Sequence, residues 1–323
     1  MAKRVILKDI ADELNITINT VSRALKDKSD ISEKTTRLVK DVALKLGYIP
    51  DKVASSMRTS STKTIAVLFD NLLNPYFMIM ANQIENELSK RNYKMMIFTT
   101  NSYATLDVDA FMEMVSRRVD GIITFLRPSP TVADLAKKMA LPMVIVGREG
   151  DDLGIDSVYT NDYLGGYLMA EYFYSKNYTK VAYLGAPKTI LCGQKREEGF
   201  VAYYKEKGID ISKNVYNTDF VPNSSTNTLK KILKNNIDAI FCFNDSMAFE
   251  ASIYVNSIYN FHNIEITGYD NVALNFNLPI KIATIGTDVS KIISSCVNSL
   301  LYRITDPNRK TYKEMVDVYL VRP

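Results

Sequence analysis

The stretch Leu7–Leu25 has the sequence LKDIADELNITINTVSRAL, and it predicts two short helices joined by a tight turn. Apolar residues recur at i, i+3, i+4 and i+7 from Leu7 to Leu14, which makes one apolar helix face. Asn15 suits a left-handed turn position, and Thr17 can cap a second helix. This pattern is typical of a helix-turn-helix, whose second helix enters the major groove of DNA.

The outer face of the predicted second helix carries side chains that can recognise bases. Asn19 can bond an adenine at N6 and N7, Arg23 can fork onto guanine O6 and N7, and Ile18 can contact a thymine methyl. Ser22 lies on the same face. The alternative is that both helices belong to a small helical domain of another kind, because such helix pairs are common.

A third helix is predicted after Ser32, which can cap it, and Gly47 can end it in a left-handed conformation. Its apolar stripe is expected to consist of Leu38, Val39, Val42, Ala43 and Leu46. Residues 1–63 hold thirteen Lys and Arg against eight Asp and Glu, whereas the rest of the chain holds 27 basic and 28 acidic residues. Positive charge concentrated in the small helical unit is expected for a module that binds phosphates.

At several points the sequence resembles the lactose-repressor (LacI/GalR) family of bacterial transcription regulators. The resembling segments are Lys8–Ala11, Thr20–Leu25, Leu46–Pro50, Val53–Arg58 and Thr64–Val67. Their order extends the match well beyond a helix-turn-helix. The resemblance implies a homodimer, or a tetramer, on a pseudo-palindromic double-stranded DNA operator, because a two-fold operator needs two heads.

Residues 50–58 can form a short helix, since Pro50 suits its first position. The resemblance implies that this helix folds in the minor groove, where Met57 would act as an apolar wedge at a base step. The alternative is that Met57 anchors the linker to the body. The full set of expected DNA contacts is Thr17, Ile18, Asn19, Ser22, Arg23, Tyr48, Val53, Ala54, Met57 and Arg58.

From Thr64 onward, predicted strands alternate with predicted helices, which is typical of parallel sheets covered by helices on both faces. The chain has 323 residues, enough for two or three domains. We therefore expect an N-terminal all-α helix-turn-helix head and an α/β body of two Rossmann-like subdomains. The resemblance implies that this body has the architecture of a type I periplasmic binding protein.

The expected boundaries are 1–49 for the DNA-binding head, 50–63 for the hinge helix and linker, and 64–323 for the effector-binding and dimerisation body. Within the body, 64–161 with 288–316 would form one subdomain, and 162–287 with 317–323 the other. The chain would cross between them near Asn161, Thr287 and Val316.

Ligands of such bodies bind at the carboxyl ends of the strands. Tyr76 and Phe77 follow the first strand and offer aromatic faces to a sugar or base, although Phe77 could equally belong to a helix core. Arg196 can fork onto a carboxylate, phosphate or vicinal diol, the alternative being a surface arginine. With the resemblance, the expected effector-binding set is Tyr76, Phe77, Arg148, Arg196, Phe220, Asn244, Asp270 and Thr287.

Two neighbours of these positions bear on the expected ligand. Gly147 stands where many members of the family have an aspartate, so that acidic contact is absent. Asp245 is expected to cap the helix that begins there, because a carboxylate accepts hydrogen bonds from the first N–H groups of a helix.

Several classes of function are disfavoured. The sequence shows no pair of carboxylates placed for acid/base chemistry, no cluster with metal-ligand spacing and no Gly-rich phosphate loop. The single histidine, His262, lies in an Asn-rich stretch, and Cys192, Cys242 and Cys296 are scattered and expected to be buried thiols. We therefore expect no enzyme, no metal and no cofactor.

The sequence shows no secretory signal and no run of about 18 apolar residues, so we expect a cytoplasmic protein without a membrane partner. The favoured hypothesis is a repressor controlled by a small molecule in the cleft, in the first place a sugar or sugar derivative. The alternatives are control by a nucleobase or by a protein co-repressor. A solute-binding receptor would share the body but would have a signal peptide and no basic head.

Overall fold

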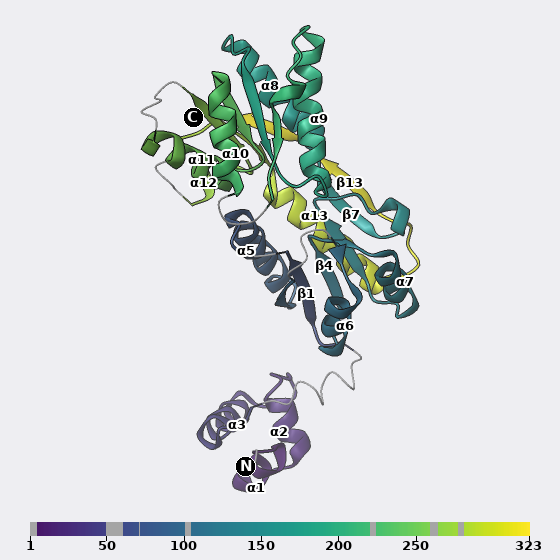
Figure 1. Cartoon of the computed structure of the whole chain (residues 1–323). Helices are drawn as coiled ribbons and strands as arrows, with labels where there is room; N and C mark the ends of the chain where they lie inside the picture. Colours follow the sequence, from purple (N-terminus) through teal and green to yellow (C-terminus); the bar gives the residue numbers. More distant parts are fainter. Residues whose placement is uncertain are drawn as a thin grey trace. The chain divides into compact units, whose positions relative to one another are not determined.

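The computed structural model describes residues 5–49, 61–70, 72–100, 105–219, 224–258, 264–276 and 281–323 (Figure 1). The chain divides into two compact units, Met1–Thr62 and Lys63–Pro323. Some predicted positions lie outside the described residues, namely Val53, Ala54, Met57 and Arg58 of the hinge, Phe220 and His262.

The described part of the first unit contains the helices α1 (Leu7–Leu14), α2 (Ile18–Ala24) and α3 (Glu33–Leu46). Asn15 ends α1 in the left-handed conformation, with a φ of 54°. The Thr17 hydroxyl accepts a hydrogen bond from the N–H of Thr20 at 3.0 Å, and so caps α2. The predicted pair of helices and the turn between them are therefore confirmed.

The core of this unit consists of the buried residues Ile10, Ala11, Val21, Ala24, Val39 and Ala43. The apolar stripe of α3 is narrower than predicted, because Leu38 is 51% exposed. Leu38 lies one residue before the buried Val39, which is about 100° around a helix, and therefore points away from α1 and α2.

The described part of the second unit contains two six-stranded sheets. The first has the strand order β13-β7-β6-β4-β1-β2, with all neighbours parallel. Its strands are β1 (Thr64–Phe69), β2 (Lys94–Thr99), β4 (Gly121–Thr124), β6 (Met143–Val146), β7 (Asp156–Thr160) and β13 (Lys313–Val316). Two short strands, β3 (Thr105–Leu106) and β5 (Arg127–Pro128), pair with each other.

The second sheet has the strand order β14-β12-β11-β10-β8-β9, and only β14 runs antiparallel to its neighbour. Its strands are β8 (Val181–Gly185), β9 (Val215–Asn217), β10 (Ala239–Cys242), β11 (Glu265–Tyr269), β12 (Thr284–Thr287) and β14 (Val318–Val321). Mostly parallel strands that alternate with helices confirm the predicted α/β body.

Helices cover both faces of each sheet. A cluster of buried apolar side chains lies between the sheet and the helices on each face. On the first sheet, α5 (Pro75–Ser89) and α13 (Val289–Thr305) contribute to one cluster, and α6 (Val108–Ser116) and α7 (Pro130–Lys138) to the other. On the second, α8 (Asp162–Ser175) and α9 (Leu191–Glu206) lie opposite α10 (Ser224–Ile232) and α11 (Asp245–Ile258). The short α12 (Val272–Asn275) follows β11.

Among the described segments, the chain passes between the two sheets at three points. It leaves the first sheet after β7 to form α8, returns after β12 to form α13, and crosses again between β13 and β14. Because strands of both sheets end at these crossings, the carboxyl ends of the two sheets face a common region.

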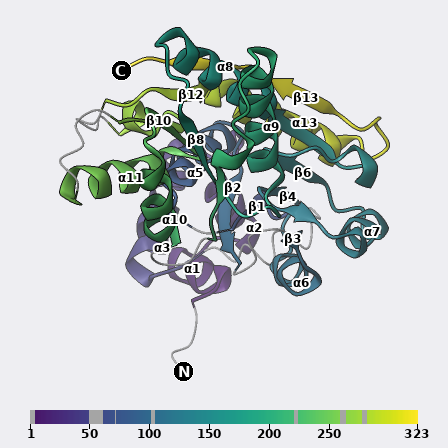
Figure 2. The same cartoon turned by 45° about the horizontal axis from the view of Figure 1, so that its top comes forward.

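The helices α8 and α9 pack side by side, so closely that their backbones are in contact (Figure 1; Figure 2). An added Cβ at Gly166 of α8 would overlap the carbonyl oxygen of Arg196, and one at Gly199 of α9 would overlap the carbonyl oxygen of Tyr163. The two glycines are therefore what allows the helices to touch.

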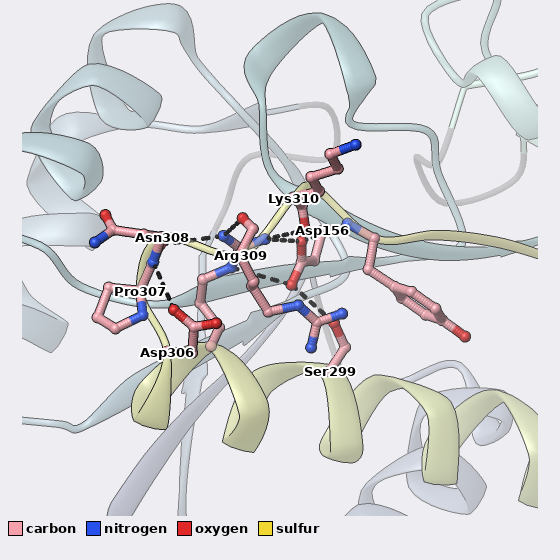
Figure 3. A network of polar contacts seen from close by, with 9 residues as sticks. Asp156, Ser299, Asp306, Pro307, Asn308, Arg309 and Lys310 are labelled. Carbon is pink, nitrogen blue, oxygen red and sulfur yellow. Dashed lines mark hydrogen bonds and ion pairs between the residues drawn. The ribbon is translucent and has the colours of Figure 1, made fainter.

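A buried carboxylate fixes the segment that leads into β13 (Figure 3). Asp156 of β7 forms an ion pair with Arg303 at 2.5 Å and accepts hydrogen bonds from the Ser299 hydroxyl and the Tyr312 N–H, both at 2.8 Å. The Arg303 guanidinium also donates to the carbonyl oxygens of Pro307, Arg309 and Lys310. One ion pair therefore holds β7, α13 and the approach to β13 together.

We predict that Arg303→Met lowers the free energy of unfolding by about 3–5 kcal/mol, because it leaves the fully buried Asp156 carboxylate without its cation. Urea denaturation of the full chain measures the change. Arg117→Met is the matched control, since Arg117 pairs with Glu113 at the surface and should cost less than about 1 kcal/mol. Equal losses in the two variants would contradict the role given to Asp156.

We also predict that Gly166→Ala lowers the free energy of unfolding by about 1–3 kcal/mol, because its Cβ forces α8 and α9 apart. Gly193→Ala in α9 is the control, since a Cβ there makes only ordinary contacts, the nearest at 3.4 Å. The control should be neutral or stabilising, as alanine favours a helix over glycine. A Gly166→Ala variant as stable as the control would show that the helices can separate without cost.

Candidate functional site

A cavity of about 380 Å³ lies between the two halves of the second unit, at the carboxyl ends of the strands. Six of the eight predicted effector-binding residues line it, namely Tyr76, Phe77, Arg148, Arg196, Asn244 and Asp270. Thr287 is not among the residues that line the cavity, and its contact with the effector stays a prediction. It lies at the end of β12, where its hydroxyl donates to the carbonyl oxygen of Asp317 at 3.3 Å. Phe220 is outside the described residues.

An aromatic wall is built on the first turn of α5. Pro75 begins the helix, and the Asn74 side chain caps it by accepting a hydrogen bond from the Tyr76 N–H at 3.0 Å. The Phe77 ring lies with its centroid 5.5 Å from that of Phe125, in an edge-on arrangement. Phe77 therefore belongs both to the core of the first sheet and to the cavity.

The Arg196 guanidinium is held from several sides and is only 7% exposed. Its Nε donates to Asp162 at 2.8 Å, its Nη1 donates to the carbonyl oxygen of Phe243 at 2.7 Å, and its Cζ lies 3.4 Å from the centroid of the Tyr269 ring. Burial alone would lower the pKa of Arg196, but the Asp162 carboxylate raises it well above its usual value. A charged arginine is therefore present, with its charge already balanced.

The pairing bears on the predicted role of Arg196. Its Nε is engaged by Asp162, so the guanidinium reaches the cavity with a carboxylate partner already in place, and its predicted contact with the effector stays a prediction. Both side chains of this pair are less than a tenth exposed. Asp162 was not predicted, because an acidic residue in the first turn of a helix is also what the helix dipole favours.

Asn244, and not Asp245 as predicted, caps the helix α11. The Asn244 Oδ1 accepts a hydrogen bond from the Met247 N–H at 2.9 Å, so that Asn244 caps α11 while its side chain also lines the cavity. Asp245 is fully buried and accepts from the Val272 N–H and the Thr284 hydroxyl, both at 2.7 Å. Burial raises the pKa of Asp245 to about 6.

Asp270 lies at the carboxyl end of β11 in an unusual backbone conformation. Its φ is 104°, a backbone conformation that residues other than glycine rarely adopt, and Asn271 follows with a φ of 52°. Backbone strain of this kind persists where the surroundings impose it, often at functional sites. Its N–H donates to the carbonyl oxygen of Ile285 at 2.8 Å, and its side chain is 9% exposed on the cavity wall.

Other cavity residues were not predicted. Asp70, Asp219 and Glu250 line it, and so does Cys192, which is half-buried and not the buried core thiol that was expected. Cys242 and Cys296 are buried as predicted. Asp70 directly follows β1 and could have been found by the same strand-end argument that selected Asp270.

The first unit presents the predicted recognition face on α2. Thr17, Ile18 and Asn19 are exposed, and Ser22 is half-buried. Arg23 forms a bidentate ion pair with Asp30, with Nε at 2.8 Å and Nη2 at 2.6 Å from the two carboxylate oxygens. This pair was not predicted, and it gives the Arg23 side chain a defined direction. Tyr48 is partly buried against the core of the same unit.

The residues that the structure describes contain no group of three or more His, Cys, Asp or Glu side chains arranged to hold a metal ion. In the same residues, no helix combines the length and the apolar character needed to cross a lipid bilayer.

Comparison with protein-family models gives matches over both units. Residues 6–51 match the bacterial regulatory proteins of the lacI family, and residues 62–261 match the periplasmic binding proteins and sugar binding domain of the LacI family. The HTH-type transcriptional repressor PurR of Aliivibrio salmonicida is 28% identical over 94% of this chain and 93% of the relative. The ribose operon repressor of Haemophilus influenzae is 25% identical over 96% and 95%.

Solved structures show the same fold. The lac repressor dimer bound to operator and the anti-inducer ONPF has a TM-score of 0.81 at 21% identity, covering 99% of this chain and 98% of that one. A LacI family regulator from Enterococcus faecium with bound ribose has a TM-score of 0.70 at 24% identity, covering 80% and 97%. The expected periplasmic-binding-protein architecture is confirmed, and the chain belongs to the LacI family of bacterial regulatory proteins.

Proposed function

We propose that this protein is a transcriptional repressor that binds a pseudo-palindromic DNA operator as a homodimer and responds to a small molecule in its cavity. The observation that carries the proposal is the exposed face of α2, with Ile18, Asn19 and the oriented Arg23, in a chain whose other unit encloses a ligand-sized cavity. The proposed domains are 1–49 for the head, 50–63 for the hinge and linker, and 64–323 for the body.

On DNA, α2 would lie in the major groove, with Asn19 and Arg23 on base edges and Ile18 on a thymine methyl. Asp30 supports this role of Arg23, because the ion pair fixes the guanidinium before DNA arrives and so reduces the ordering that binding requires. The family resemblance assigns further contacts to Thr17, Ser22 and Tyr48, and minor-groove contacts to Val53, Ala54, Met57 and Arg58.

The proposed effector is a sugar or a sugar derivative. The cavity combines the aromatic wall of Tyr76 and Phe77 with the side chains of Asn244 and Asp270, and sugar sites use such combinations of stacking and hydrogen bonding. The ribose-bound regulator from Enterococcus faecium has the same fold. The aromatic wall also suits a nucleobase, which is the second candidate.

Control by the effector would use the three crossings between the two sheets. A ligand that touches both halves favours the arrangement in which they are close, and the coupling free energy is its preference for that arrangement. The change would reach DNA through the hinge. The effector acts as a co-repressor if the arrangement that it favours places the two heads at the spacing of the operator half-sites, and as an inducer if it does not.

A thermal-shift screen of the full chain against sugars, sugar phosphates and nucleobases tests the proposal. A ligand at about a hundred times its Kd adds about 2.7 kcal/mol of stability, which raises the Tm by several degrees. A compound that raises the Tm should also change the affinity for the operator. A library without any effect on either measurement would contradict small-molecule control and favour a protein co-repressor.

We predict that Arg23→Ala weakens operator binding by about 1–3 kcal/mol and relaxes the choice of one base pair in each half-site. Binding to the operator and to a set of single-base variants measures both effects. Arg37→Ala is the control, since Arg37 is also an exposed arginine of the same unit but lies on α3. An equal loss on operator and random DNA would mean that Arg23 contacts a phosphate.

We predict that Asp270→Ala reduces the response of operator binding to the effector by at least about tenfold in effector concentration, because the ligand loses a buried polar partner. The response is measured by titrating the effector against the repressor–operator complex. Asp134→Ala removes the same charge from the surface of α7, outside the cavity lining, and should respond normally. A normal response in Asp270→Ala would place the effector elsewhere.

A further inference from the structure

The described lining of the cavity is strongly acidic. Asp162 and Arg196 neutralise each other in their buried pair. The other charged residues of the lining are four carboxylates, Asp70, Asp219, Glu250 and Asp270, and one guanidinium, Arg148. Carboxylates therefore outnumber cations among these residues. Asp219 and Glu250 are exposed, whereas Asp270 is buried, so the charge of Asp270 interacts more strongly than a charge in bulk solvent.

The carboxylate of Asp270 is a second and independent observation. It lies on the cavity wall, is more than nine-tenths buried, and accepts no hydrogen bond from any described residue. Burial raises the pKa of Asp270 well above its usual range; nearby Arg196 opposes this change, and Asp245 and Asp162 add to it. A buried carboxyl group without a partner is costly, so a ligand that supplies a partner gains free energy at this atom.

Asp270 is also held in place. Its backbone keeps a φ of 104° because the Asp270 N–H is bonded to Ile285 of β12, and because the Asp245 carboxylate anchors the neighbouring N–H of Val272 and the hydroxyl of Thr284. The carboxylate therefore cannot easily turn away to find another partner. A ligand group must come to it.

We propose that the effector is a polyhydroxylated amine, such as an amino sugar, and that its ammonium group binds at the Asp270 carboxylate. This inference rests on the proposed function, since it assigns a chemical class to the effector of that site. An ammonium group donates to the Asp270 oxygens and places a positive charge beside this buried carboxylate, which favours its ionised form. The hydroxyls can bond Asn244, and the apolar face of the ring can lie on Tyr76 and Phe77.

Anionic ligands fit this site poorly. A phosphate or carboxylate would normally be bound by an arginine fork. Arg196 already donates to Asp162, which leaves Arg148 as the other arginine of the described lining, against four carboxylates. Such a ligand would also lie among the acidic residues of the lining. A neutral sugar would donate hydrogen bonds to Asp270 but would bring no positive charge to this buried carboxylate.

The test uses the full chain and sugar triplets that share one ring configuration and differ in charge. Glucosamine, galactosamine and mannosamine, with an ammonium group in place of the C2 hydroxyl, are compared with their neutral parents and with the corresponding uronates, which carry a carboxylate at C6, by calorimetry at a pH below the pKa of the amines. The amines should bind at least about tenfold more tightly than the parents, and the parents more tightly than the uronates, because the charge changes while the ring is kept. Each binding compound is then titrated into the operator complex.

Two variants of the lining localise the effect. Asp270→Asn keeps the shape and tolerates a positive φ, and should reduce the preference for the amine below about threefold. Glu250→Gln changes an exposed residue of α11, so that it folds readily, and should reduce the preference by a smaller factor. Asp134→Asn, outside the lining, should keep the full preference.

The outcomes separate this inference from the proposed function. A panel in which parents or uronates bind at least as tightly as amines, or in which no amine binds, overturns the inference. If such a neutral or anionic compound changes operator affinity, the proposed function stands and only the assigned class of effector is wrong. If amines bind through Asp270 but leave operator affinity unchanged, the assigned ligand class holds and the proposed control of DNA binding fails.

Discussion

The buried ion pair between Asp162 and Arg196 is the interaction on which the cavity depends. Both side chains are almost completely removed from water, a state that is tolerable only while each keeps its partner. One stands at the start of α8 and the other in α9, so the pair can form only because Gly166 and Gly199 bring the two backbones into contact. The charge balance of the site is therefore set by the packing of two helices.

The charged residues of the molecule are distributed unevenly between its parts. The head is basic, as a phosphate-binding surface requires, whereas the rest of the chain is close to neutral. That near-neutrality hides a local imbalance, because acidic residues gather in the cavity lining. Asp245 and Asp156 show the opposite use of a carboxylate, since both are buried and fully engaged in joining elements of the fold. Burial alone therefore does not mark a ligand contact; the ligand contact proposed at Asp270 rests on a buried carboxylate on the cavity wall that accepts no hydrogen bond from the described residues.

The sequence was sufficient for the elements whose pattern is local. Apolar periodicity and capping residues predicted the head, and strand-end positions together with the family resemblance predicted six of the residues that line the cavity. The strand β7 begins with Asp156 and Ser157, which are polar although they are buried, so no local pattern indicates their burial; Ser299, a partner of Asp156, lies far along the chain. The direction of the Thr287 side chain depends on the crossing into α13, which no local pattern indicates either. Likewise, the local sequence around Asp162 and around Asp30 does not indicate which arginine each of them pairs with.

The third crossing has a consequence for how the chain can be shortened. The last two strands lie next to each other in sequence, yet β13 forms an edge of the first sheet and β14 an edge of the second. A premature stop codon before Lys313 would therefore expose two new strand borders at once, one in each half. Unpaired borders of that kind attract strands of other molecules, so nonsense alleles of this region should accumulate as insoluble protein and not as a trimmed regulator.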